Sequence, residues 1–238
     1  MTERDWFNAL QRPISPIRLE AYREEDASDI ETLANYFWNM ELSEALYPSL
    51  QAFEIALRNG IHSALTDHFK DAMWFDRPDL MLDWQTEAVA KAREELTKHN
   101  KAHEPGRIIA ELHFGFWHSM FNRPYEEVLW YANGAALIEA VFPHLPRHLR
   151  KRKEIWRRID RIRRLRNRVF HYEPIWKKRD LEELSVIIHD MTHAISPELA
   201  AIIALSTHYP ELLRDGAEGT QAKLLRIMEM DDYLQAGH

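Results

Sequence analysis

Apolar residues recur at intervals of three and four along most of this chain, the spacing that places them on one face of an α-helix. No segment keeps the strict alternation of apolar and polar residues that is typical of a β-strand. The pattern therefore predicts an all-α fold. The clearest run consists of Leu46, Leu50, Phe53, Leu57, Ile61 and Ala64.

Prolines, polar loops and capping residues predict where the helices begin and end. Pro13 and Pro16 predict an irregular segment over residues 1–23, and Ser43 is the expected N-cap of a long helix. We expect one helical domain over residues 24–213 and a C-terminal helix or tail over 214–238. The predicted helices span residues 26–40, 43–69, 82–98, 107–121, 124–141, 147–172, 180–195, 197–208 and 220–233.

Composition narrows the class of protein. The 238 residues are 45% hydrophobic and 29% charged, which is ordinary for a globular protein with a buried core. The absence of cysteine excludes disulfides and thiolate metal sites, and it fits a reducing cytoplasm. The first residues are too polar for a signal peptide, and no apolar run is long enough to cross a bilayer. We expect a cytoplasmic protein without a membrane partner.

The net charge of −7 hides a concentration of basic residues. Residues 147–168 contain twelve Lys or Arg and only two acids, Glu154 and Asp160, so this segment carries +10 and the rest of the chain −17. Such a block predicts either a surface that binds a polyanion or a solvated helix face balanced by acids of neighbouring helices. The side chains expected to contact RNA in the first case are Arg157, Arg158, Arg161, Arg163, Arg164 and Arg168.

The basic helix ends in the segment LRNRVFHYEPIW, residues 165–176. On a helical wheel at roughly 100° per residue, Arg166 falls within the apolar arc, so its charge needs an anionic partner or a cleft. Asn167 and His171 are four residues apart and share the adjacent flank. Pro174 places His171 in the last turn, where the helix dipole favours a protonated imidazole and nearby arginines oppose it. The remaining members of the arc are Ile155, Ile159, Ile162, Leu165, Val169 and Tyr172.

An arginine can grip a phosphate through its fork of donors, and a histidine can transfer protons near neutral pH. Arg166, Asn167 and His171 therefore suggest chemistry on a phosphodiester. In the alternative interpretation, Arg166 satisfies a carboxylate in a helix interface and His171 is a packing residue. An Arg and a His at this spacing often occur by chance, so the spacing alone favours the alternative.

Four blocks of the sequence, in the expected order, resemble the Abi-like (AbiD/AbiF-type) abortive-infection family, a branch of the HEPN superfamily. LRNRVFHYEPIW resembles the family signature, and the apolar residues 108–121 resemble the block ahead of it. FEIALRNGIHSAL, residues 53–65, resembles the N-terminal Glu-x-x-x-Arg-Asn block, and residues 196–213 resemble the C-terminal part. The resemblance covers roughly residues 43–213.

The resemblance implies an HEPN-like helical bundle with additional helices, and a homodimer whose two motifs form one composite site. It implies a metal-independent endoribonuclease without a cofactor, in which the RNA 2′-hydroxyl attacks the adjacent phosphate to leave a 2′,3′-cyclic phosphate. His171 would act as general base or acid, Arg166 would stabilise charge on the phosphoryl oxygens, and Asn167 would orient His171 or the phosphate. RNA would be the partner, in phage defence or toxin action, and a toxin would add an antitoxin as a second partner.

Within the N-terminal block, Glu54, Arg58 and Asn59 are expected to support the site, for example through a carboxylate contact to Arg166. The alternative is a surface ion pair between Glu54 and Arg58, worth a few tenths of a kcal/mol. One departure from the family concerns regulation. Some HEPN toxins carry a tyrosine two positions after the histidine, where a partner enzyme modifies it, but this chain has Glu173 there, so we do not expect that control.

Other candidates are weaker. His189 and His193 have the spacing of a zinc-protease helix, but Asp190 stands in place of the catalytic glutamate and no third ligand is apparent. Two other functional hypotheses stand beside that of a nuclease. The chain could be a non-catalytic RNA-binding or regulatory module, or a structural protein in which residues 155–172 form a dimer seam. Four tryptophans could stack on bases, although core packing is their expected role: Trp117, Trp130, Trp156 and Trp176.

Overall fold

The computed structural model describes residues 2–78, 80–131 and 134–236, and it has no β-strand among them, so the predicted all-α class is confirmed. Contacts between residues divide the chain into two compact units. The terminal unit comprises Met1–Pro48, Asn167–Glu183 and Ser206–His238, and the central unit comprises Ser49–Arg166 and Leu184–Leu205. The interval 24–213, expected to be one domain, thus contributes to both units.

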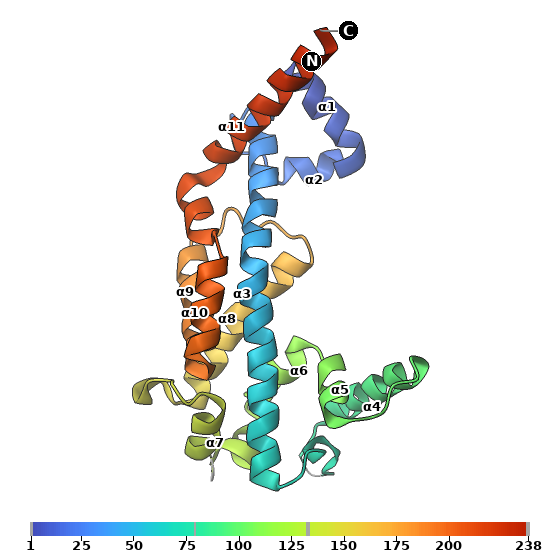
Figure 1. Ribbon diagram of the computed structural model, residues 1–238, viewed down its shortest axis with the longest axis vertical. Coiled ribbons are helices and arrows are strands. Elements are labelled where there is room, and N and C mark those ends of the chain that lie inside the picture. The colour runs from blue at the N-terminus through green and yellow to red at the C-terminus, as the bar shows by residue number, and fades with distance from the viewer. Residues whose placement is uncertain (1, 79, 132–133, 237–238) are drawn as a thin grey trace. The chain divides into compact units, whose positions relative to one another are not determined.

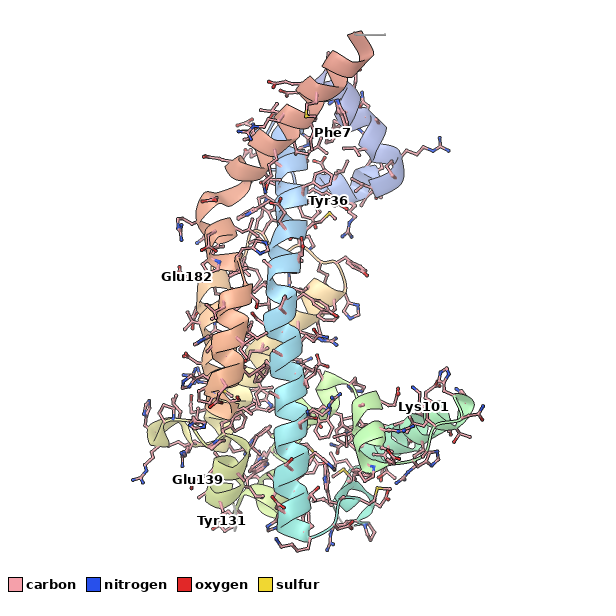
Figure 2. All side chains as sticks on the ribbon, in the orientation of Figure 1. Phe7, Tyr36, Lys101, Tyr131, Glu139 and Glu182 are labelled. Carbon is pink, nitrogen blue, oxygen red and sulfur yellow. The ribbon has the colours of Figure 1, made fainter. Side chains whose placement is uncertain are left out.

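The terminal unit is built from helices near the two ends of the chain (Figure 1). It contains α1 (Glu3–Ile14), α2 (Pro16–Glu20), the first half of α3 (Asp29–Phe69) and α11 (Tyr209–Ala236). Figure 2 shows Phe7 between α1 and α11, where it joins a small apolar core. The other buried members of that core are Leu19, Ile30, Leu33 and Met228.

The expectation of an irregular segment over residues 1–23 is wrong. Thr2 and Asp5 form a capping box that starts α1, with the Thr2 side chain accepting from the backbone N–H of Asp5. Pro13 lies in the last turn of α1, and Pro16 occupies the first turn of α2, where a missing N–H leaves no helical bond unmade. The two prolines therefore separate two helices instead of preventing them.

The expected break before residue 43 is also wrong, because α3 runs without interruption from Asp29 to Phe69 (Figure 1). Ser43 does not cap a helix. Its hydroxyl donates to the carbonyl oxygen of Asn39, 2.8 Å away and one turn earlier, which is how a serine is accommodated within a helix. Pro48 is also accommodated inside α3.

The central unit contains the second half of α3 and most of the shorter helices. The predicted helix over 107–121 is broken, because Leu112 is extended and the ring of His113 accepts from the backbone N–H of Phe116 as a new N-cap. The predicted helix over 124–141 is a π-helix followed by α7, and its residues 132–133 lie outside the described residues. The helices are α4 (Asp83–Lys98), α5 (Pro105–Glu111), α6 (Phe114–Ser119), the π-helix η2 (Glu126–Tyr131), α7 (Gly134–Val141) and α10 (Pro197–Ser206), with 3₁₀ turns η1 (Trp74–Asp76) and η3 (Arg147–Leu149).

Two further helices, α8 (Arg152–Phe170) and α9 (Leu181–Ile195), contribute residues to both units. The predicted helix over 147–172 is shorter in the structure. Its first residues form the 3₁₀ turn η3, and α8 begins only at Arg152 and ends at Phe170. At the C-terminus, α11 is longer than the predicted helix over 220–233. It bends at Gly216, whose φ of 64° and ψ of −168° are outside the helical region and suit only glycine.

Candidate functional site

The apolar face of α8 agrees with the sequence except at its end. Tyr172 is 74% exposed, because α8 ends at Phe170 and the backbone of Tyr172 leaves the helical path. Its predicted place in the apolar arc is therefore wrong. The predicted members of the arc within the helix are all buried, namely Ile155, Ile159, Ile162, Leu165 and Val169.

Arg166 is held by a carboxylate. Its Nε donates to Oε2 of Glu54 on α3 at 3.1 Å, and the two side chains are only 24% and 23% exposed. A pair with so little contact with water holds the guanidinium more firmly than a fully exposed pair would. The expected contact between Glu54 and Arg166 is confirmed. Arg58 instead donates from Nε to Oδ1 of its neighbour Asn59 at 3.2 Å.

Asn167 and His171 belong to the terminal unit, because the boundary between the units falls after Arg166. Asn167 is half-buried, and its carbonyl oxygen accepts from the backbone N–H of His171 at 2.9 Å. The side chain of His171 is exposed. It is therefore accessible to a substrate, and it does not fit the alternative in which His171 is a packing residue.

The chain leaves α8 through a Schellman motif, a common way to end a helix. The backbone N–H of Glu173 donates to the carbonyl oxygen of Arg168 at 2.8 Å, and that of Tyr172 donates to Val169 at 3.2 Å. This pattern makes His171 the C-cap residue. The negative end of the helix dipole lies at this position and favours positive charge there.

Tyr172 occupies the position of the motif where glycine is usual. Its φ is 57°, in the left-handed region, which costs a bulky residue on the order of 1 kcal/mol. Arg18 of α2 stabilises the turn by donating from Nη2 to the carbonyl oxygen of Tyr172 at 2.6 Å. The sequence reasoning missed both residues. The available signal was that α8 had to end before Pro174 with no glycine nearby to make the turn.

In the middle of α8, acids of the same helix pair with the predicted RNA-binding arginines. Arg157 lies 3.2 Å from Glu154, and Arg163 and Arg164 each lie 2.8 Å from Asp160. The basic face is thus partly balanced by acids of α8 itself. Acids of neighbouring helices add to this balance, as the second interpretation of the charge block expected, because Arg150 lies 2.9 Å from Glu139 and Arg152 lies 3.0 Å from Glu126.

The remaining predicted RNA-binding residues have varied surroundings. Arg158 and Arg161 are half-buried, and Arg168 is 47% exposed. Arg168 donates from Nη1 to the carbonyl oxygen of Pro174 at 3.1 Å and lies 3.9 Å from Glu173. These contacts help to hold the segment after α8 in place, and RNA binding by these side chains stays a prediction.

A buried cluster around Asp160 was missed by the sequence reasoning. His118 of α6 places Nε2 3.5 Å from Oδ1 of Asp160, too long for a good hydrogen bond, so this buried nitrogen has no hydrogen-bond partner. Burial, reinforced by the charge of Arg163, lowers the pKa of His118 from 6.5 to about 4, against the opposing charge of Asp160. Burial works to raise the pKa of Asp160, but Arg163 and Arg164 outweigh it and lower that pKa.

The remaining candidates are two histidines on α9 and four tryptophans, of which Trp156 lies on α8 with its ring centre 5.8 Å from that of His118. The rings of His189 and His193 lie 6.3 Å apart on α9, and no group of three or more His, Asp or Glu side chains within the described ranges could hold a metal ion. Trp117, Trp130 and Trp176 are buried, in agreement with a packing role. Trp156 is half-buried and donates from its indole nitrogen to Asn122 at 2.7 Å.

In the part of the chain that the structure describes, no helix combines the length and the apolar character needed to cross a membrane. Comparison with known proteins yields no matching family model, no matching curated protein and no matching solved structure.

Proposed function

We propose that this chain is a metal-independent endoribonuclease of the Abi-like HEPN type, acting in the cytoplasm in phage defence or as a toxin. The observation that carries the proposal is the exposure of His171 at the end of the basic helix α8, five residues after an arginine held by Glu54. A proton-transfer group at the surface and a positioned guanidinium are what phosphodiester cleavage requires.

The proposed reaction forms a bond from the RNA 2′-oxygen to phosphorus and breaks the bond from phosphorus to the 5′-oxygen. One proton must leave the 2′-hydroxyl and one must reach the 5′-oxygen, so the reaction uses a base and an acid. His171 takes one of these roles. Arg166 stabilises the charge that develops on the phosphoryl oxygens, and Asn167 orients His171 or the phosphate.

The helix geometry supports a site shared by two copies. Five residues on an ideal α-helix correspond to roughly 500°, so the sequence spacing of Arg166 and His171 favours directions about 140° apart. One copy therefore does not easily direct both side chains to the same phosphate. In a homodimer with a composite site, His171 of one copy can act beside Arg166 of the other, and the two histidines supply both the base and the acid.

The test is incubation of the purified 238-residue chain with mixed RNA in EDTA. We expect cleavage that leaves 2′,3′-cyclic phosphate and 5′-hydroxyl ends, and loss of this activity in His171→Ala. His99→Ala is the matched control, because His99 is also exposed but follows α4, far from residue 171 in the sequence. Intact RNA with the wild-type chain, or equal cleavage by His171→Ala, contradicts the proposal.

The ion pairs along α8 favour a second candidate function, in which this helix is structural. Arginines that already satisfy Asp160 and Glu54 contribute to folding whether or not RNA binds. A purely structural protein predicts no RNA affinity at physiological salt. A non-catalytic RNA-binding module predicts salt-sensitive binding without cleavage, weakened by charge reversal of Arg157 and Arg158.

A further inference from the structure

A cavity of about 780 Å³ opens beside the end of α8, entirely within the terminal unit. Its size lies within the range of small-molecule sites, which are mostly apolar with a few polar groups. The proposed cleavage by Arg166, Asn167 and His171 does not require this cavity. Among the residues that line it are Arg18, Tyr36, Asn39, Tyr47, Val169 and Tyr172.

Three tyrosines line this cavity, two from α3 and one from the turn after α8. Tyr36, labelled in Figure 2 on α3, lies under the guanidinium of Arg18, 5.8 Å from its ring centre. Tyr47 stacks on Phe170, with ring centres 5.2 Å apart and planes 22° apart, and remains 45% exposed. Tyr172 is 74% exposed. Exposed aromatic surface around a cavity is typical of a site that binds a flat ligand.

The conformation of Tyr172 supports a binding role. A glycine would end α8 without strain, yet the chain holds a tyrosine in the left-handed region with help from Arg18. Left-handed residues without a structural need for their side chain are concentrated at functional sites. Tyr172 also follows His171 directly, so their Cα atoms are about 3.8 Å apart.

Two polar side chains that line the cavity, Asn39 and Arg18, indicate which hydrogen-bonding groups a ligand would need. Asn39 is only 4% exposed, and its Oδ1 accepts from the backbone N–H groups of Ile175 and Trp176 at 2.7 and 3.2 Å. With both lone pairs of that oxygen used, any further hydrogen bond of the amide is donated by Nδ2. Arg18 is also a donor only. The buried amide and the arginine therefore favour a ligand edge with hydrogen-bond acceptors, and Glu44, an acceptor that also lines the cavity, suits the donor groups that bases carry as well.

We propose that this cavity binds one unpaired base of the RNA, stacked on Tyr172 and with its acceptor edge toward Asn39 and Arg18. Bases are flat, carry acceptor edges and stack on aromatic side chains without regard to sequence. Base binding in itself needs only the cavity. The placement of this base next to the cleaved phosphate rests on the proposed function, through the adjacency of Tyr172 and His171.

The experiment compares two fluorescent 12-residue probes, a mixed-sequence single-stranded RNA and an abasic oligonucleotide of the same charge. Binding is measured by anisotropy with the full chain carrying His171→Ala, so that the RNA is not cut during the measurement. We expect the RNA to bind roughly 5- to 150-fold more tightly than the abasic probe, the range for stacking one base on an aromatic ring. Tyr172→Gly should remove most of that preference.

The substitution Tyr172→Gly suits the fold, because glycine adopts the left-handed conformation without strain. A loss of base preference with an unchanged or raised melting temperature therefore reports the ring and not misfolding. Tyr172→Phe should retain the preference. Asn100→Gly is the control, since Asn100 is exposed, has a φ of 52° and belongs to the central unit.

The outcomes separate this inference from the proposed function. Base-dependent binding that disappears in Tyr172→Gly supports the cavity site even if the wild-type chain cuts no RNA. Cleavage by the Tyr172→Gly chain with an unchanged KM and an unchanged base preference overturns the inference and leaves the nuclease standing. Equal binding of both probes by His171→Ala overturns it as well. So does a change from dimer to monomer in Tyr172→Gly by light scattering, because the cavity would then be an interface between copies.

Discussion

The middle of α8 is held by ion pairs within the helix, whereas the turn that ends it contains a strained backbone position. In the middle, Arg163 and Arg164 converge on Asp160, whose side chain is only 9% exposed. At the end, His171 and Tyr172 are exposed, and the backbone at Tyr172 is strained. The middle therefore has the character of a folding element, and the end is the part for which we propose RNA binding, although the sequence joins them in one basic segment.

The difference teaches that a count of charges does not locate a ligand site. The segment 147–168 carries +10 in the sequence, but much of that charge meets a carboxylate in the fold. What distinguishes the end of α8 is instead backbone strain at Tyr172, since Arg164 in the middle is as exposed as Tyr172. The strain arises where the helix must stop and where no glycine is available to make the turn.

The largest expected effect contrasts two arginines of α8 that both pair with a carboxylate. Arg166→Ala should lower kcat/KM for RNA cleavage by about 10²- to 10³-fold, because it removes a donor aimed at the developing charge. Arg152→Ala is the matched control, since Arg152 pairs with Glu126 at 3.0 Å and is 16% exposed. It should change kcat/KM by less than about threefold. Initial rates on a quenched fluorescent RNA measure both.

The proposed role of Arg166 is contradicted if the two substitutions reduce cleavage equally. Thermal unfolding of each variant by circular dichroism shows whether a loss of rate reflects loss of fold. Arg166→Lys should recover little activity, because an ammonium does not reproduce the planar fork of the guanidinium.

The second effect is a pH dependence of stability from the cluster in the middle of α8. His118 has a folded pKa of about 4 and an ordinary value of 6.5, so between these values the unfolded chain binds a proton that the folded chain does not. Stability contributed by neutral His118 is fully present above pH 6.5 and is lost as the pH falls toward 4. The loss should be on the order of 3 kcal/mol.

Urea unfolding at pH 7.5, 6, 5 and 4.5 measures this effect. His118→Gln, which does not titrate, should show a much flatter dependence over that range. Asp160 does not contribute to the change in stability over this pH range. Its pKa is lowered in the folded chain, so the stability that its carboxylate contributes is lost only below pH 3.8, its ordinary pKa. Parallel curves for the wild-type and variant chains contradict the prediction.

The sequence predicted the helices whose apolar pattern is strong and whose ends carry clear breakers. The predictions over 82–98 and 180–195 agree with α4 and α9 to within one residue. The errors occurred where a local rule was overridden. Pro13 and Pro16 were accommodated at helix ends, and Ser43 was absorbed into α3 by a bond to the preceding turn.

At the candidate site, the sequence predicted the partner of Arg166 but not the cluster around Asp160. Glu54 could be found because an arginine in an apolar arc needs a carboxylate, and the block with Glu54 offered one. His118 lies 42 positions before Asp160, and no spacing rule connects residues of different helices. The strain at Tyr172 and its contact with Arg18 depend on the way the helix ends, which hydrophobic periodicity does not report.

The third effect compares two acids of α8. Asp160→Asn should reduce the free energy of unfolding by about 2 kcal/mol, because it weakens charge-assisted bonds from Arg163 and Arg164 at a buried position. Glu154→Gln should cost less than about 1 kcal/mol, because its partner Arg157 is 62% exposed. Chemical unfolding at pH 7.5 measures both, and a larger loss for Glu154→Gln would reverse the assignment of the structural acid.

The smallest effect tests whether a paired arginine and an exposed lysine of α8 contribute equally to RNA binding. Lys153 is exposed, and Lys153→Gln should reduce the slope of log K against log salt concentration by about 0.7 if that side chain neutralises one phosphate of a single strand. Arg164 is 72% exposed but already lies 2.8 Å from Asp160, so it releases fewer ions when RNA arrives. Arg164→Gln should therefore change the slope by less. Anisotropy titrations from 50 to 200 mM salt measure both slopes. Equal slopes would mean that Asp160 does not retain Arg164 when RNA binds, and that the middle of α8 belongs to the RNA-binding surface after all.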